Sequence, residues 1–266
     1  MLVISRERWI MKKIWLVIMG VILGVFCRNI NGVYSAPIDL PRGLQDVKKI
    51  PDSQRLMFGL ELDAISERKM EHFNAELKGN IITAKAFYST GYGIDFYGLI
   101  GRTQGFEYKI DDLDLVCKWD DDYMLGLGMN MVIFIPVLQE NMIWPFIDLK
   151  YRAIKDVDYD SINVGGAAAQ ANVVNNISTD WWERQLSLGI AKKYEMLIAY
   201  TGIKYSDVHI ACDVDVGGVN YKGYNDADYN YGIFIGCMVP MEKVKIGLEV
   251  RLVDEQAVTC KVHYQF

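Results

Sequence analysis

The final nine residues, Val258–Phe266, alternate between apolar and polar side chains without a slip. Apolar side chains stand at every second position, which are Val258, Cys260, Val262, Tyr264 and Phe266. A period of two places these side chains on one face of a β-strand and the polar side chains on the other. The chain is therefore predicted to end in an amphipathic strand that turns one face to an apolar environment.

The same period recurs along the chain and predicts ten strands. They lie near residues 55–65, 80–88, 94–103, 122–135, 143–155, 181–193, 195–206, 228–239, 243–252 and 256–266. Connections after the second, fourth, sixth and eighth strands are short, whereas those after the first, third, fifth and seventh are long and polar. The mean hydropathy of +0.07 excludes a bundle of membrane helices, because each such helix needs about 20 apolar residues.

An even number of strands of about ten residues, joined by alternating short turns and long loops, is typical of one architecture. It predicts an all-β fold, a closed antiparallel up-and-down transmembrane β-barrel of about ten strands, within a range of 8–12. In hydrocarbon every backbone N–H and C=O needs an internal partner, so a sheet there must close on itself. The alternative is a soluble β-sandwich, a binding module that turns its apolar faces into a core.

The N-terminal region predicts secretion. Lys12 and Lys13 precede Ile14–Phe26, a run without charge that has the length of a signal-peptide core. The predicted divisions are a signal peptide over 1–35, with Met11 as an alternative start, a periplasmic N-terminal tail over 36–53, and a barrel over 54–266. Cleavage removes five of 28 basic residues and one of 34 acidic residues, leaving a formal charge of −10. This charge argues against nucleic acid as a partner.

Charged residues of both signs fall on the inward face of the predicted barrel. Opposite charges in a narrow lumen can pair and so offset the cost of their desolvation. Two interpretations stay open, a polar plug that stabilises the barrel and a constricted pore for small solutes. The inward residues are Glu61, Asp63, Lys85, Asp95, Asp148, Lys150, Arg152, Lys204, Lys245, Glu249, Arg251, Lys261 and His263.

The signal segment, the amphipathic strands and the ending Val262-x-Tyr264-x-Phe266 resemble the small outer-membrane β-barrel proteins of Gram-negative bacteria. The resemblance covers the chain from about residue 54 onward. It implies a location in the bacterial outer membrane, in contact with its lipid. It further implies that Val262, Tyr264 and Phe266 are the signal read by the barrel-assembly machinery. The expected role is structural or that of a narrow, porin-like pore, without enzymatic activity or cofactor.

The long loops are acidic, and one of them starts like a calcium loop. Asp156, Asp158 and Asp160 give the D-x-D-x-D pattern that calcium-binding loops use. Ser161 stands where such a loop needs glycine, and Ala167 stands where it needs a bidentate glutamate. No metal site is therefore predicted, and divalent cations remain an alternative partner of these loops.

A second loop pattern resembles the omptins, which are ten-stranded outer-membrane proteases. Asp207 and His209 stand two apart at the end of one predicted strand, and Asp112 and Asp114 stand two apart in another loop. The resemblance implies a low-ranked alternative in which His209 is the general base and Asp207 orients it. Asp112 and Asp114 would then hold the attacking water.

Aromatic and cysteine residues complete the sequence-based expectations. Aromatic side chains near strand ends are predicted to form the girdles at the membrane surfaces: Tyr88, Trp144, Tyr151, Trp181, Trp182, Tyr205, Tyr229 and Tyr264. Cys117 and Cys212 fall in outer loops, where a disulfide and two free thiols are both compatible with the sequence.

Overall fold

The computed structural model describes residues 38–41, 55–71, 74–168, 175–216 and 219–266. The predicted signal peptide over 1–35 lies outside the described residues. So does the predicted periplasmic tail over 36–53, apart from the segment Ile38–Pro41.

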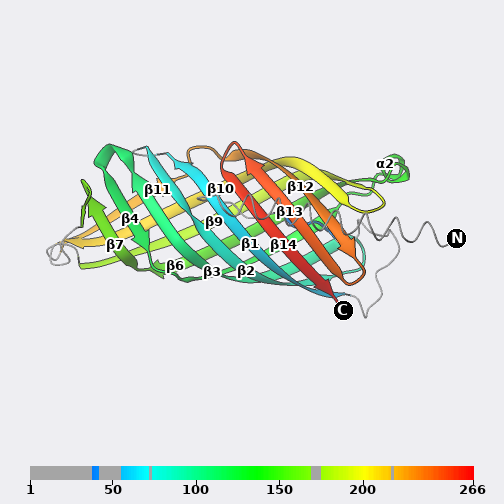
Figure 1. The fold of residues 1–266 in the computed structure, drawn as a ribbon, viewed down its shortest axis with the longest axis horizontal. Coiled ribbons are helices and arrows are strands. Elements are labelled where there is room, and N and C mark those ends of the chain that lie inside the picture. The colour runs from blue at the N-terminus through cyan, green and yellow to red at the C-terminus, as the bar shows by residue number, and fades with distance from the viewer. Residues whose placement is uncertain (1–37, 42–54, 72–73, 169–174, 217–218) are drawn as a thin grey trace, which may run out of the picture. The chain divides into compact units, whose positions relative to one another are not determined.

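Ten antiparallel strands form one closed barrel, as the sequence predicts (Figure 1). Each strand pairs with its neighbour around the ring, and β2–β3 pairing completes the circle. The strands are β1 (Leu56–Met70), β2 (Ala75–Ser89), β3 (Ile94–Ile110), β5 (Tyr123–Val132), β6 (Ile143–Val157), β9 (Asn175–Lys193), β10 (Ile198–Val216), β12 (Tyr231–Met241), β13 (Val244–Leu252) and β14 (Gln256–Gln265).

The last strand closes the barrel against the first. Strands β1 and β14 pair from Met57 opposite Gln265 to Ile65 opposite Ala257, so the predicted closure is confirmed. A soluble sandwich needs two sheets packed face to face, whereas this chain forms a single closed sheet. The soluble alternative is therefore wrong.

Large apolar side chains cover the outside of the barrel. On β1 the exposed fractions are 52% for Leu56, 49% for Phe58 and 60% for Leu60, while the alternate residues Met57 and Glu61 are buried at 2–3%. The same alternation runs along the other strands. An apolar outer face and a closed hydrogen-bonded wall satisfy the two demands that a lipid bilayer makes on a sheet.

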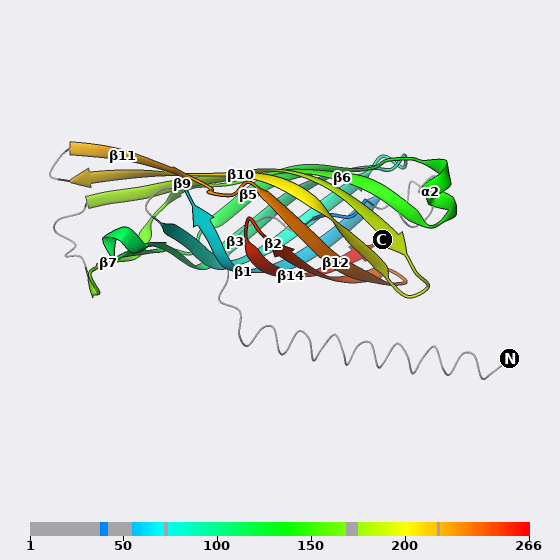
Figure 2. The same cartoon turned by 90° about the horizontal axis from the view of Figure 1, so that it is seen from above.

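The long connections fold as additional strands, so their prediction as loops is wrong. They contain β4 (Leu115–Trp119), β7 (Tyr159–Val164), β8 (Ala167–Ala168), β11 (Val219–Asp226) and a 3-10 turn, η3 (Asp111–Leu113). β4 pairs with β3 and β7, and β11 pairs with β10. Strands β9 and β10 each run for 19 residues, and with β11 and β7 they extend the wall at one end (Figure 2).

The opposite end carries the short connections, one of which holds the five-residue helix α2 (Pro136–Glu140). Short turns mark the periplasmic end in outer-membrane barrels, so the extended sheet belongs to the cell surface. No helix among the described residues has both the length and the apolar character needed to cross a membrane.

The expected aromatic girdles are partly wrong. Tyr88, Tyr151, Tyr205, Tyr229 and Tyr264 are exposed on the outside. Trp144 and Trp181 instead point inward, with exposed fractions of 6% and 0%. The neighbouring tryptophans Trp181 and Trp182 occupy opposite faces of β9, as the strand period requires.

Candidate functional site

The lumen gathers the charged side chains. All thirteen inward residues named from the sequence are buried, with exposed fractions of 5% or less: Glu61, Asp63, Lys85, Asp95, Asp148, Lys150, Arg152, Lys204, Lys245, Glu249, Arg251, Lys261 and His263. They come from seven different strands of the barrel. A buried charge is tolerated when it is paired and hydrogen-bonded. The partners of these groups therefore bear on whether the lumen is a polar plug or a pore.

One group of charges surrounds Glu183 on β9. Arg152 Nε donates to Glu183 Oε2 at 2.6 Å, and Arg68 Nη1 lies 3.5 Å from Glu183 Oε1. Ser206 also donates its hydroxyl to this carboxylate. Arg152 additionally stacks over the ring of Trp181, with 5.1 Å between the guanidinium carbon and the ring centroid. The network links β1, β6, β9 and β10 through the middle of the barrel.

A second group centres on Arg251 of β13. Its guanidinium donates to Asp63 at 2.5 Å, to Glu255 at 3.0 Å and to Thr259 at 2.7 Å. Lys204 pairs with Asp254 at 2.9 Å and also with Glu255. Asp254 and Glu255 lie in the turn between β13 and β14, so this turn folds its carboxylates inward over the lumen.

The segment Ile38–Pro41 lies inside the barrel. These four residues belong to the segment 36–53, which the sequence predicts to be a periplasmic tail. Ile38 N donates to Glu249 Oε1 at 3.0 Å, and Lys261 donates to the carbonyl of Ile38. Asp39, with no exposed surface, pairs with Lys85 at 2.7 Å and with Lys150 at 2.8 Å. The positive lumen charges thus draw in this part of the chain.

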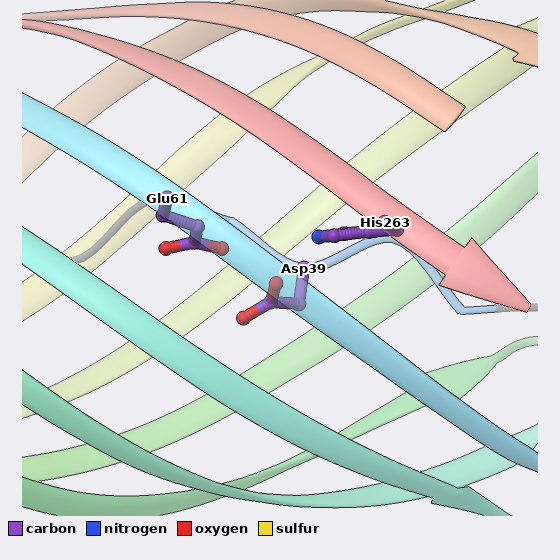
Figure 3. A group of neighbouring side chains, drawn as sticks. All are labelled: Asp39, Glu61 and His263. Carbon is purple, nitrogen blue, oxygen red and sulfur yellow. The ribbon is translucent and has the colours of Figure 1, made fainter. Parts of the chain in front are cut away.

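Asp39, Glu61 and His263 lie together, as Figure 3 shows. Each offers one metal-ligating atom, and these atoms lie within 4.8 Å of one another. His263 packs against β1 at Gly59, where an added Cβ would lie 2.7 Å from its Cδ2 atom. The ring centroid of Phe87 lies 5.3 Å away on another side. Glycine and phenylalanine together therefore fix the orientation of this imidazole.

Two tyrosine side chains lie along the lumen face of the wall, each over a glycine of the neighbouring strand. Tyr97 lies over Gly128 and donates its hydroxyl to Asp148 at 2.8 Å. Tyr200 lies over Gly236 and donates to Glu249 at 2.9 Å. Each glycine leaves the room that the ring occupies, which brings the hydroxyl within reach of a buried carboxylate.

The omptin-like residues do not assemble across the barrel mouth. On β10, Val208 and Ile210 point inward and have exposed fractions of 0–1%. Asp207 and His209 alternate with them and therefore point outward. His209 Nδ1 lies 2.5 Å from Asp226 of β11, and its ring stacks on Trp182. A protease site of the omptin kind would need these side chains to face the lumen, so this arrangement does not support the low-ranked protease alternative.

The other two members of that set lie in and beside η3. Asn74 donates to Asp112 at 2.8 Å, and Asp114 adopts a left-handed backbone with φ of 46°. Of the calcium-like residues, Asp156 lies in β6, Asp158 lies between β6 and β7, and Asp160 lies in β7. They are not brought together as ligands in the part of the chain that the structure describes. Cys117 and Cys212 are free thiols, and burial raises the pKa of Cys117 to about 11.

The period of two does not place several of the lumen residues, and the structure shows why. Arg68 points inward because the β1 register shifts between Ile65 and Arg68. Glu183 follows the period of two on β9 and lies on the same face as Trp181. A prediction that Trp181 points inward would therefore also have placed Glu183 in the lumen. No strand pattern identifies Asp39, Asp254 or Glu255, because each lies outside a strand.

The geometry defines a class of protein. A single closed antiparallel sheet, an apolar outer face and a charged lumen are the features of a transmembrane β-barrel of the bacterial outer membrane. This location agrees with the expectation from the sequence.

No protein-family model and no curated protein matches the sequence. Among solved structures, the chain is similar to the translocator domain of the autotransporter NalP from Neisseria meningitidis. The identity is 10%, with 85% of this chain and 93% of that chain covered and a TM-score of 0.47. For OprG from Pseudomonas aeruginosa the identity is 12%, the coverage 79% and 94%, and the TM-score 0.39.

A third similar structure is the COG4313 outer membrane channel from Pseudomonas putida F1. Its identity to this chain is 9%, with 86% of this chain and 100% of that chain covered and a TM-score of 0.41.

Proposed function

We propose that this chain is a non-enzymatic outer-membrane barrel with a filled lumen, whose role is structural. It would anchor the extended sheet of β4, β7, β9, β10 and β11 at the cell surface. The observation that carries this proposal is the packing of the lumen, which changes in character along the barrel but contains buried side chains throughout.

At the periplasmic end, the lumen holds an apolar cluster around the N-terminal segment. Ile38 and Leu40 are buried among side chains from β5, β6, β9, β10 and β12. The barrel members of the cluster are Val132, Trp144, Phe146, Ala191, Ile198, Tyr200, Phe234 and Met238. Removing this apolar surface from water favours the inserted segment, which supports a closed periplasmic end.

In the middle, paired charges bridge the lumen. The Arg152–Glu183 and Arg251–Asp63 pairs join side chains at 2.6 Å and 2.5 Å. In a conducting pore, the charged side chains of the lumen would be exposed to water and to the passing solute. Pairs between fully buried groups support a structural role instead, because each charge is neutralised by its neighbour.

Toward the cell surface, the interior becomes an apolar core. Phe106, Trp119, Trp181 and Val208 have exposed fractions of 0–3% and pack in one cluster with residues from β1, β2 and β6. Trp119 comes from β4, so the added strands contribute to this core. Close packing of such side chains leaves little room for a hydrated ion, which supports a closed outer end.

A second candidate, a narrow pore, rests on a specific observation. The segment Ile38–Pro41 is not a strand of the barrel, and side chains of the wall hold it in place. A segment of this kind could leave the lumen while the barrel stays closed as a sheet. In this candidate, small solutes would pass when the segment is displaced.

Conductance in planar bilayers distinguishes the candidates. The structural proposal predicts that the purified barrel is silent, and that deleting residues 38–41 leaves it silent because the outer core remains packed. The plugged-pore candidate predicts a silent full-length protein and a conducting deletion variant. Conductance by the full-length barrel would contradict the structural proposal outright. For the non-enzymatic part, a broad peptide library is expected to stay uncleaved.

A further inference from the structure

We propose that Asp39, Glu61 and His263 form a binding site for one divalent transition-metal ion of the Zn²⁺ type inside the lumen. The three side chains come from the segment Ile38–Pro41, from β1 and from β14 (Figure 3). Their ligand atoms lie within 4.8 Å of one another. An ion bound here would fasten the N-terminal segment to the seam where the barrel closes.

Apart from Glu61 Oε1, which is ion-paired with Lys85, two buried atoms in the cluster have no hydrogen-bond partner. These are Nε2 of His263, whose exposed fraction is 2%, and Oδ1 of Asp39, whose exposed fraction is 0%. A buried polar atom without a partner costs free energy, so native structures seldom keep one. A metal ion between the imidazole and the carboxylate would satisfy both atoms at once.

His263 is held in position for such a role. Its inward direction is set by β14, where Lys261 and His263 share the lumen face. Gly59 on β1 admits the ring, and Phe87 packs beside it. In Figure 3 a ring nitrogen points toward the side of the lumen where the carboxylates of Glu61 and Asp39 lie. Little rearrangement of the imidazole is therefore needed for it to bind an ion.

The donor set selects the class of ion. One imidazole nitrogen with two carboxylate oxygens, completed by water, matches the ligands of tetrahedral Zn²⁺. Ca²⁺ prefers six to eight oxygen ligands, which this cluster does not offer. Zinc bonds are about 2.0–2.2 Å long, so side-chain rotations of Asp39 and Glu61 would draw the ligand atoms together.

Lys85 would compete with the ion for the carboxylates of Asp39 and Glu61. Its Nζ lies 2.6 Å from Glu61 Oε1 and 2.7 Å from Asp39 Oδ2. This ammonium supplies the positive charge between the carboxylates, and a bound ion would displace it. Lys150 also pairs with Asp39 at 2.8 Å, whereas Lys261 pairs with Glu249 at 2.9 Å. Removing the charge of Lys85 should therefore strengthen metal binding.

The test titrates Zn²⁺ into the purified full-length mature barrel in detergent and measures heat and bound-metal stoichiometry. We expect one Zn²⁺ per chain, and visible absorption bands when Co²⁺ is used instead. His263→Gln should weaken binding at least about tenfold, a loss that changes even to residues around metal ligands produce. His209→Gln is the matched control and should bind as the wild type does, because His209 lies on the outer face. Lys85→Met should bind more tightly.

Three results would overturn the proposal: no bound Zn²⁺ in the wild type, equal binding by the two histidine variants, or no gain in Lys85→Met. Gel mobility of unboiled samples reports whether each variant folds. If His263→Gln does not fold, Glu61→Gln carries the test with the same expected loss. The titration needs no voltage or conductance, so its outcome is independent of whether the barrel is a structural element or a pore.

Discussion

Arg251 on β13 donates to Asp63 on β1 at 2.5 Å, so the pair crosses β14, the strand that lies between them. Thr259 of β14 donates to the same Asp63 oxygen at 2.5 Å. Three consecutive strands at the closing seam are thus joined by side chains as well as by their backbone ladder. The seam is where the two ends of the sheet meet, and these contacts favour the closed register.

The first prediction concerns this seam. Arg251→Met leaves Asp63 buried without its principal partner and removes one of the two cations that pair with Glu255, the other being Lys204. The free energy of unfolding should therefore fall by about 3–5 kcal/mol. Urea unfolding of the barrel in lipid vesicles measures the change. Lys222→Met is the control, because the Lys222–Asp213 pair is exposed at 60% and 41% and should contribute less than about 1 kcal/mol. Equal stability of the two variants would count against a role for the seam.

A second prediction concerns the tyrosine that lies over a glycine. A Cβ at Gly128 would lie 2.2 Å from Cζ of Tyr97, so Gly128→Ala must displace the ring and break its hydrogen bond to Asp148. We expect a loss of about 1–3 kcal/mol in unfolding free energy. Gly98→Ala is the control, since nothing lies within 4 Å of its added Cβ and the change should be close to neutral. If both variants unfold at the same urea concentration, the close packing of Tyr97 against Gly128 does not contribute to the free energy of unfolding.

The sequence predicts the barrel well because the period of two acts on every strand. Glu61 and Lys261, for example, can be placed on the lumen face from their parity alone, and the structure buries both. Parity fails where the backbone departs from a regular strand. At Arg68 a bulge shifts the faces, and at Asp39 no strand exists to set a direction. The contacts of these residues depend on the folded lumen, which local pattern does not describe.

The sequence pattern does not reveal the surface sheet, for a related reason. Residues 104–121 and 207–227 are rich in aspartate, and this composition predicts solvated loops. The aspartates lie largely on the outward face or at turns, whereas Cys117, Trp119 and Ile210 fill the inner face. A period of two was therefore present but was obscured by the charge of one face.

The third prediction is a pH dependence set by Asp254 in the β13–β14 turn. Burial, followed by the charge of Glu255, raises the pKa of Asp254 from 3.8 to about 6. The folded state therefore holds this proton more tightly than the unfolded state does. Between pH 4 and 6 the unfolded chain loses the proton first, so the contribution of Asp254 to the free energy of unfolding falls as pH rises.

Asp254→Asn removes this titration and isolates its effect. The stability of the variant relative to wild type should increase from pH 4 to pH 7, by up to about 3 kcal/mol. Urea unfolding at unit steps of pH measures the difference. Asp228→Asn, the same change at an exposed carboxylate near the same end of the barrel, is measured alongside as the control for the substitution itself. A difference that is flat with pH for Asp254→Asn would show that the carboxylate is not held protonated.

The last prediction concerns Phe266, the final residue of the proposed assembly signal. Its ring packs on Phe58 of β1 at 5.5 Å and on Tyr264 at 5.0 Å, measured between centroids. With an exposed fraction of 53%, it contributes little to the packing of the lumen, so Phe266→Ala should refold in detergent as the wild type does. In cells, the same variant should yield less folded, heat-modifiable barrel if the assembly machinery reads this side chain. Gln265→Ala should assemble normally, and equal assembly of both variants would remove Phe266 from the signal.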